Sequence, residues 1–193
     1  ITDLVVPHSL NQITPSTSPP SQEEAGKPAP GTMLVSHNPT HLTEQENKIE
    51  ITSLALDLFM ENLYVGTSLG ELFHINVRDR SNPYLVEKAR VSDKAITALG
   101  FLLGDVSLVI GDAGGGVNVW MQVRDEMRSS GWALNKVHTL TSHHAKVIAV
   151  TSSMRDKGFV TLATDGTIHL NHATSEQTLL NFKTQSIPTA LVF

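Results

Sequence analysis

The residues of this sequence that could do chemistry are two glycine-rich stretches and a set of nine histidines. The first stretch, GTSLG at residues 66–70, matches G-x-S-x-G, which presents a nucleophilic serine between a strand and a helix. The residues that follow, ELFHINV, alternate polar and apolar side chains as a strand does. Because no helix pattern follows the motif, we interpret it as a turn between two strands, with Ser68 as a turn residue.

The second stretch is GDAGGG at residues 111–116, which could suggest a phosphate-binding loop. It lacks the Lys-Ser/Thr pair of a P-loop and the helix whose N-terminus would face the phosphate. Glycine adopts positive φ without steric cost, as hairpin turns require. We therefore assign these glycines to a hairpin and expect no cofactor.

Two groups of histidines could bring several rings to one metal ion: His138 with His143 and His144, and His169 with His172. Residues three apart on a strand point to opposite faces, so the second pair cannot chelate one ion. The sequence therefore predicts no metal site, and His143 is expected to be a structural partner of a turn backbone. No carboxylate pair or Ser/His/Asp set recurs at a converging spacing, so we expect no catalytic residue and no enzyme.

These motifs lie in a strand–turn–strand unit that occurs three times. In residues 159–173, apolar residues alternate with small or polar ones on both sides of an Asp165-Gly166 pair. This pattern predicts a hairpin closed by a type I′ turn, with positive φ at both central residues. Similar hairpins are predicted at residues 108–122 and 63–77. Their turn glycines, Gly70, Gly115 and Gly166, are 45 and 51 residues apart.

A third short strand is expected before each hairpin, at residues 51–56, 96–101 and 147–152, and a fourth copy at 187–193. A period of about 40–50 residues with about four strands per unit is typical of β-propeller blades. The predicted fold is all-β: a partial β-propeller with about three four-stranded blades plus the first strand of a fourth.

The expected domain boundaries follow this repeat. Residues 1–46 contain seven of the nine prolines, and we interpret them as an N-terminal strand and a linker rich in Pro, Ser, Thr and Glu. Residues 47–193 would form the propeller. Its blades are expected at 47–92, 93–141 and 142–184, and the next blade would start at 185–193.

The repeats resemble WD40-type repeats. In that family a histidine precedes the first strand of a blade, as His143 does here, and a D-G hairpin follows, as at residues 165–166. Trp120 occupies the family's aromatic position in the second unit, but Met121 stands where the family has Asp, and Asn171 replaces the aromatic residue in the third unit. The resemblance implies a degenerate WD40-like propeller in which the family's His–Ser–Trp–Asp network is not assembled.

A narrower resemblance covers HATSEQTLL at residues 172–180 and IPTALVF at 187–193. These segments resemble the extracytoplasmic region of long bacterial phosphate ABC transporter permeases related to the permease subunit PstC. The resemblance implies a non-catalytic periplasmic propeller domain, with an interaction or regulatory role, in an inner-membrane protein anchored through helices outside this chain. Its partners would be transporter subunits or a periplasmic protein such as the phosphate-binding protein.

Two other functions stay open on the sequence: a stand-alone WD40-like scaffold that binds a protein partner, and, least favoured, a propeller-fold hydrolase that uses Ser68. Composition argues against further classes. A net charge of −5 with no basic patch argues against binding to nucleic acid. The absence of cysteine excludes a disulfide framework. No apolar run approaches the length of about 18 residues that a membrane-spanning helix needs.

The partner surface is expected in the longest connection within a blade, residues 123–133. Loops at the ends of rigid strands carry most binding residues, and arginine and tryptophan are enriched at binding hot spots. Arg124, Arg128 and Trp132 are therefore the candidate partner-binding residues.

Packing and association can also be predicted. Three blades and one strand do not close a propeller, so two sheet faces should be uncovered. We therefore expect the chain to self-associate, or the apolar segments 4–6 and 33–35 to cover one of these faces. The residues expected to be largely buried between blades are Val109, Val117, Val119, Val160, Leu162, Ile168 and Leu170.

Overall fold

The computed structural model describes residues 48–128, 130–186, 188 and 191. The predicted N-terminal strand and linker, the apolar segments 4–6 and 33–35, and most of the predicted strand at 187–193 lie outside the described residues. The described part of the chain contains twelve strands and no helix. The all-β prediction is therefore confirmed.

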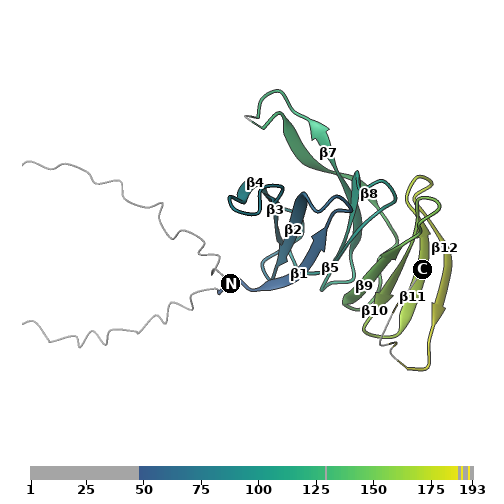
Figure 1. Ribbon diagram of the computed structural model, residues 1–193. Coiled ribbons are helices and arrows are strands. Elements are labelled where there is room, and N and C mark those ends of the chain that lie inside the picture. Colours follow the sequence, from purple (N-terminus) through teal and green to yellow (C-terminus); the bar gives the residue numbers. More distant parts are fainter. Residues whose placement is uncertain (1–47, 129, 187, 189–190, 192–193) are drawn as a thin grey trace, which may run out of the picture. The chain divides into compact units, whose positions relative to one another are not determined.

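The strands form three four-stranded antiparallel sheets, which Figure 1 shows in the order of the chain. The first sheet contains β1 (Ile51–Leu56), β2 (Asn62–Thr67), β3 (Glu71–Asn76) and β4 (Tyr84–Arg90). The second contains β5 (Ile96–Phe101), β6 (Ser107–Asp112), β7 (Val117–Arg124) and β8 (Trp132–Thr139). The third contains β9 (Val147–Ser152), β10 (Gly158–Ala163), β11 (Thr167–His172) and β12 (Gln177–Lys183). Each strand pairs with its neighbour in the chain, so the fold is a partial propeller-like array of blades.

The hairpins turn at the glycines that define the repeat, but not through the predicted type I′ turn. Gly70, Gly115 and Gly166 have φ angles of 77°, 90° and 81°, whereas Asp165 is not among the described residues with positive φ. The N–H of Gly166 donates to the carbonyl of Ala163 at 3.0 Å. This geometry is a type I turn whose fourth residue is a left-handed glycine, so only one residue of the turn needs positive φ.

The same glycines hold the segment of chain that leaves each sheet after its fourth strand. The carbonyl of the turn glycine accepts the N–H of a residue in the connection to the following sheet. The pairs are Gly70 with Ser92 (3.2 Å), Gly115 with His143 (2.9 Å) and Gly166 with Thr184 (3.0 Å). The backbone N–H of His143 makes the contact with the turn, whereas its side chain contacts Thr161 on β10 and not a turn backbone.

Two apolar cores lie between successive sheets. Between the first and second sheets pack Tyr64, Leu72, Ile96, Leu108 and Ile110. The core between the second and third sheets contains Val109, Val117 and Val119, packed with Val147 and Phe159. The predicted burial of these three valines between blades is therefore confirmed.

The other predicted core residues form a separate cluster on the far face of the third sheet. Val160, Leu162 and Ile168 are buried there beside Leu191, so they do not lie between two described sheets as predicted. Leu170 is only partly buried, because its partner across the ladder is Leu180 on the exposed edge strand β12.

Truncation of Leu162 tests this cluster. Leu162 is 2% exposed, and removing most of a buried leucine side chain leaves a cavity in the packing. Leu162→Ala is expected to cost about 2–5 kcal/mol of unfolding free energy. Urea unfolding followed by far-UV circular dichroism measures the effect. An unchanged midpoint would contradict the placement of the third hairpin.

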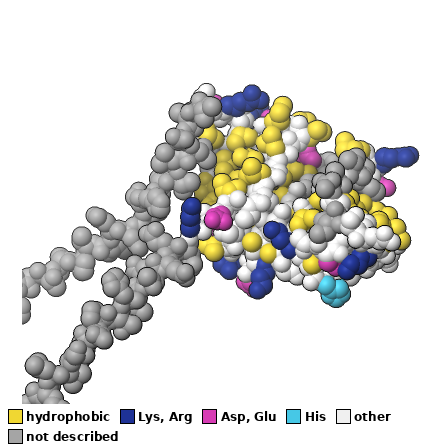
Figure 2. All heavy atoms as spheres, turned by 90° about the horizontal axis from the view of Figure 1, so that it is seen from below, with side chains coloured by type: hydrophobic (Ala, Val, Ile, Leu, Met, Phe, Trp, Pro, Cys, Tyr) yellow, Lys and Arg dark blue, Asp and Glu magenta, His cyan; other side chains and the backbone are white. Residues whose placement is uncertain are grey.

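One face of the first sheet is apolar, and its residues belong to no core cluster of the described chain. Leu54 and Leu56 on β1 are 60% and 46% exposed. Figure 2 shows hydrophobic side chains over a broad area at the left of the described part, the side on which β1–β4 lie in Figure 1. Two rows of cross-strand neighbours form this face: Leu54, Val65 and Phe73, and Leu56, Leu63, Ile75 and Leu85.

The predicted self-association should depend on this face. A lysine in place of Leu54 or Leu56 puts a charge at the exposed β1 end of the apolar rows, so Leu54→Lys and Leu56→Lys are expected to shift the chain towards the monomer. Met127→Lys, at a loop residue that is 98% exposed, is the control. Sedimentation velocity over a range of concentrations measures the shift. A wild-type chain that stays monomeric throughout would contradict the prediction.

Candidate binding site

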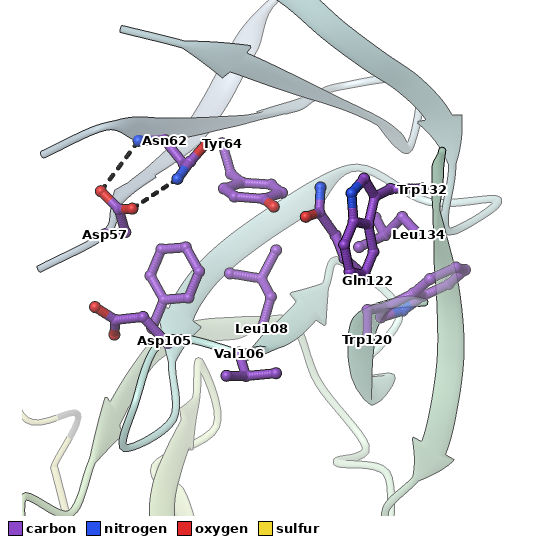
Figure 3. A pocket seen from close by; sticks show the side chains of 11 residues that line it. Asp57, Asn62, Tyr64, Asp105, Val106, Leu108, Trp120, Gln122, Trp132 and Leu134 are labelled. Atoms are coloured by element: carbon purple, nitrogen blue, oxygen red, sulfur yellow. Dashed lines mark hydrogen bonds between the residues drawn. The ribbon is translucent and has the colours of Figure 1, made fainter. Parts of the chain in front are cut away.

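A cavity of about 270 Å³ lies between the first and second sheets (Figure 3). Strands β2, β5, β6, β7 and β8 and the turns after β1 and β5 contribute its walls. Carboxylate, amide and aromatic side chains predominate, and no lysine or arginine takes part. The lining residues are Asp57, Asn62, Tyr64, Phe101, Asp105, Val106, Leu108, Trp120, Gln122, Trp132 and Leu134.

The first acidic residue of the cavity, Asp57, organises the β1–β2 turn. Its Oδ1 accepts the backbone N–H groups of Glu61 (2.8 Å) and Asn62 (3.0 Å), and its Oδ2 accepts the Asn62 side-chain amide at 2.8 Å. Burial disfavours the charge, but the hydrogen bonds from Asn62 and Glu61 outweigh it and lower the pKa of Asp57. The carboxylate is therefore ionised and held in place at the cavity wall.

The second acidic residue, Asp105, ties two neighbouring turns together. Its Oδ2 accepts the backbone N–H of Leu58 at 2.6 Å, so the β5–β6 turn holds the β1–β2 turn. Asp105 has a φ of 53°, in the left-handed region that aspartate tolerates better than most residues. Among the described residues, no basic side chain forms an ion pair with Asp57 or Asp105.

A polar chain behind the cavity joins the two sheets. His74 Nε2 lies 2.9 Å from Asn62 Oδ1, and Gln122 Nε2 lies 2.8 Å from His74 Nδ1. Since the Asn62 amide nitrogen already donates to Asp57, its oxygen accepts from His74, which assigns the proton of the neutral ring to Nε2. Burial lowers the pKa of His74 to about 4, although Asp57 favours its protonated form.

Aromatic rings form most of the remaining wall. Tyr64 stacks on His74 with ring centroids 4.4 Å apart and meets the edge of Phe101 at 5.5 Å. Burial, with the carboxylates of Glu87 and Asp57, raises the pKa of Tyr64 to about 12, so the phenol is a neutral hydrogen-bonding group. The Trp120 indole nitrogen is buried and has no partner among the described residues.

The predicted binding residues occupy the β7–β8 hairpin, which projects at the top of Figure 1. Arg124 and Trp132 are not in a loop as predicted: they end β7 and β8 and are paired across the ladder, so the loop spans only residues 125–131. The Arg124 guanidinium lies 5.9 Å from the Trp132 ring centroid. Arg128 binds Glu87 at 2.5 Å and Asp125 at 3.4 Å.

Of these three residues, only Trp132 lines the cavity. The other lining residues were not predicted from the sequence, because they come from separate turns and strands. One feature of the repeat could have indicated the cavity: Asp57 and Asp105 both lie in turns after the first strand of a blade.

The two glycine-rich motifs are turns in the structure. Ser68 Oγ accepts the backbone N–H of Glu50 at 3.0 Å, and a strand, β3, follows the motif. In the second motif the N–H groups of Gly114 and Gly116 both donate to Asp112 Oδ1 at 2.9 Å. The chain's own carboxylate therefore fills the position that an anion would take.

The histidines of the third blade form a buried network. His143 Nε2 lies 2.8 Å from Thr161 Oγ1, and Asn171 Nδ2 donates to the same oxygen at 3.2 Å. Thr178 Oγ1 donates to Asn171 Oδ1 at 2.8 Å. Asn171 supplies an N–H at the position where WD40-type repeats have tryptophan, but these bonds include no tryptophan and no aspartate, so they are not the His–Ser–Trp–Asp network of that family.

The histidine groups that were considered as candidate metal ligands have other partners in the structure. The His143 ring stacks instead on His169, with centroids 3.8 Å apart, and His138 Nδ1 binds Glu176 at 2.7 Å. Among the residues that the structure describes, no group of three potential ligands could hold a metal ion.

Comparisons with known proteins identify the fold but no family. No family model matches the chain, and no curated protein matches it. It is similar to a structure titled "Crystal Structure of Mitotic Checkpoint Complex", with a TM-score of 0.56, 13% identity, and coverage of 69% of this chain and 38% of that one. It is also similar to "Crystal structure of the computationally designed Ika4 protein", with a TM-score of 0.56, 23% identity, and coverage of 72% and 76%.

At these identities the comparisons show a propeller-like fold alone. The chain spans about two fifths of the first matched chain, at 38%. Within the residues that the structure describes, no helix is long and apolar enough to cross a membrane.

Proposed function

We propose that this chain is a non-catalytic interaction domain that binds a partner at the edge formed by the β1–β2, β5–β6 and β7–β8 turns. The observation that carries the proposal is the position of the cavity at that edge, beside exposed apolar turn residues. Asp57 and Asp105 line the cavity and also hold the β1–β2 turn. The cavity and the turn therefore form one rigid surface.

The apolar residues are unevenly distributed between the two edges of the sheets. In the β1–β2 turn, Leu58 and Phe59 are each 75% exposed, and Leu103 and Met154 occupy the position of Leu58 in the next two blades and are also exposed. The turns at the opposite edge, residues 68–70, 113–116 and 164–166, expose no large apolar side chain in the described chain. Exposed apolar groups that gather on one side mark an interaction surface.

The backbone of the β1–β2 turn supports the same proposal. Met60 has a φ of 56°, a conformation that costs a residue with a side chain about 1–2 kcal/mol. A glycine or asparagine would serve a purely structural turn better. Backbone strain of this kind persists where the surrounding structure enforces it and is often part of a binding site.

The setting that we propose is the periplasm, as the extracytoplasmic domain of an inner-membrane permease for phosphate of the ABC type. Support comes from the resemblance of residues 172–180 and 187–193 to PstC-like permeases. The partners would then be transporter subunits or the periplasmic phosphate-binding protein. A stand-alone WD40-like scaffold is the second candidate, supported by the three blades and the binding edge.

Cell fractionation separates the two settings. An antibody against residues 48–186 should detect the native protein in membranes that resist alkaline extraction. Protease added outside spheroplasts should remove the epitope, because the domain would lie in the periplasm. Recovery of the full-length protein in the soluble fraction would contradict the permease setting and favour the scaffold.

Charge reversal in the β7–β8 hairpin tests the binding surface. Arg124→Glu with Arg128→Glu is expected to weaken partner binding at least tenfold, because arginines at interface hot spots often contribute more than 1 kcal/mol each. Binding of the purified phosphate-binding protein, measured by calorimetry, is the readout in the permease setting. Lys94→Glu, at an exposed residue of the opposite edge, is the control.

Stability must be measured beside binding, because Arg128 pairs with Glu87, whose side chain is only 7% exposed. Arg124→Glu alone leaves that pair intact. Unchanged binding by the Arg124→Glu variant and the folded double variant would remove the hairpin from the proposed surface.

A further inference from the structure

The cavity has two chemically different ends. Figure 3 shows the carboxylates of Asp57 and Asp105 on one side and the rings of Trp120 and Trp132 on the other. Apolar atoms of Leu108 lie between them. An occupant that fits both ends is long and narrow, with a positive head and a body that packs on rings and aliphatic groups.

Hydrogen-bonding groups remain open at the acidic end. Asp105 uses Oδ2 for the N–H of Leu58, and no described residue donates to its Oδ1. Tyr64 is 6% exposed, its hydroxyl points into the cavity in Figure 3, and no described residue bonds that hydroxyl. Neither atom is among the buried side-chain atoms without a partner, so both are accessible to a hydrogen-bonding ligand in the cavity.

Other ligand classes fit this lining less well. An anion would meet two carboxylates and no basic side chain of the lining. A metal ion would need ligands that Asp57 cannot provide freely, because three N–H groups already occupy its two oxygens. The volume of about 270 Å³ is just below the range of roughly 300–1,000 Å³ for pockets that hold drug-sized ligands. It suits a single side chain.

We infer that this cavity receives an arginine side chain from a protein partner, with the guanidinium at Asp105 and Tyr64 and the methylene chain along Leu108 and the tryptophans. Arginine fits better than lysine because its planar head stacks on aromatic rings while it donates hydrogen bonds to a carboxylate. The inference rests on the proposed function, since the partner that supplies the arginine is the one bound at this edge.

The chain reports on this site directly. It contains two tryptophans, Trp120 and Trp132, and both line the cavity. Intrinsic fluorescence therefore monitors occupancy without a label. The probe is N-acetyl-arginine-amide, which lacks the charged backbone groups of the free amino acid, and the matched control is N-acetyl-citrulline-amide, a neutral molecule of nearly the same shape.

We expect the arginine probe to give a saturable fluorescence change with a dissociation constant in the roughly millimolar range, and the citrulline probe to bind at least tenfold more weakly. Asp105→Asn should weaken binding of the arginine probe at least fivefold, because the negative charge is lost. The fold should be kept, because the amide oxygen can still accept the N–H of Leu58. Glu126→Gln, an acid of the hairpin loop outside the lining, should leave binding unchanged.

Three outcomes would overturn the inference: no saturable change with the arginine probe, equal binding of the two probes, or unchanged binding in Asp105→Asn. Free L-arginine that binds tenfold more tightly than the amide would also overturn it, because the ligand would then be an amino acid. If Asp105→Asn does not fold, the comparison of the two probes on the wild-type chain decides. None of these outcomes removes the proposed function, which fails only if partner binding is insensitive to the hairpin and the turns.

Discussion

Replacing Gly115 with alanine is expected to cost at least about 4 kcal/mol of unfolding free energy, among the largest effects for any single substitution. The reason is the contact between blades. A Cβ at Gly115 would lie 2.2 Å from the carbonyl oxygen of His143 and 2.9 Å from that of Ala145, both backbone atoms that side-chain rotation cannot move. The φ of 90° adds its own strain, and the hydrogen bond from the His143 N–H would be displaced.

Gly104→Ala is the matched control for this prediction. Gly104 has nearly the same φ, 88°, but a Cβ there would meet nothing within 4 Å. Gly104→Ala should therefore lower the free energy of unfolding by only about 1–2 kcal/mol, because only the left-handed conformation is unfavourable there. Urea unfolding of both variants measures the difference. Equal losses would mean that the backbone conformation matters and the approach of the two blades does not.

The repeat made most of this fold predictable. The first strands expected at residues 51–56, 96–101 and 147–152 coincide with β1, β5 and β9. The turn glycines aligned in the sequence are the residues that hold the segment of chain leaving each sheet. Such agreement is expected when local alternation and turn chemistry favour the same structure. The predicted turn type was wrong, because an Asp-Gly pair also fits a type I turn with glycine in the fourth position.

The candidate site was less predictable, for a physical reason. The cavity brings together Asp57 and Asp105, which are 48 residues apart in the chain, and adds Trp132 from the start of β8. Alternation of polar and apolar residues fixes which face of a strand is buried, but not how two faces are offset when they pack. Trp132 was predicted because it lies in the longest connection within a blade and tryptophan is enriched at binding hot spots, whereas Tyr64 looked like any other core residue of a strand.

The network in the third blade shows a second limit. WD40-type repeats place tryptophan where this chain has Asn171, and the pattern therefore predicted no network. The amide of Asn171 nevertheless donates to Thr161 and accepts from Thr178. A hydrogen-bond network requires donors and acceptors at fixed positions, so a side chain other than tryptophan that carries an N–H can bond the same neighbours, although the His–Ser–Trp–Asp set itself is absent here.

Lowering the pH from 7 to 4 is expected to remove several kcal/mol of stability through the buried histidines. Burial, together with the neighbouring His169, lowers the pKa of His143 to about 4, and burial lowers the pKa of His74 to about 4. The ordinary value in an unfolded chain is about 6.5. Between these values the unfolded chain binds protons that the folded chain does not, so stability is full above pH 6.5 and falls as the pH drops. A shift of this size corresponds to about 3 kcal/mol for each histidine.

The charged surroundings of the two rings sharpen the prediction. Asp57 faces His74 and Asp165 lies near His143, and each favours protonation, but burial prevails in both cases. His169 stacks on His143 and its own pKa is also lowered by burial, so a proton on one ring opposes a proton on the other. The buried carboxylate of Asp57 has a lowered pKa, and its contribution is lost only below pH 4. The loss of stability between pH 6.5 and pH 4 is therefore due to the histidines.

Urea unfolding at several pH values from 7.5 to 4 tests this assignment. Replacing His74 with glutamine or His143 with asparagine should lower stability at pH 7, because the hydrogen bonds to Asn62 and Thr161 are altered, and should flatten the slope of stability against pH. His144→Gln, at the exposed neighbour of His143, should keep most of the slope. The decisive quantity is the slope, because loss of packing alone lowers stability equally at every pH. Histidine variants that lose stability but keep the wild-type slope would show that these rings are not the source of the acid sensitivity.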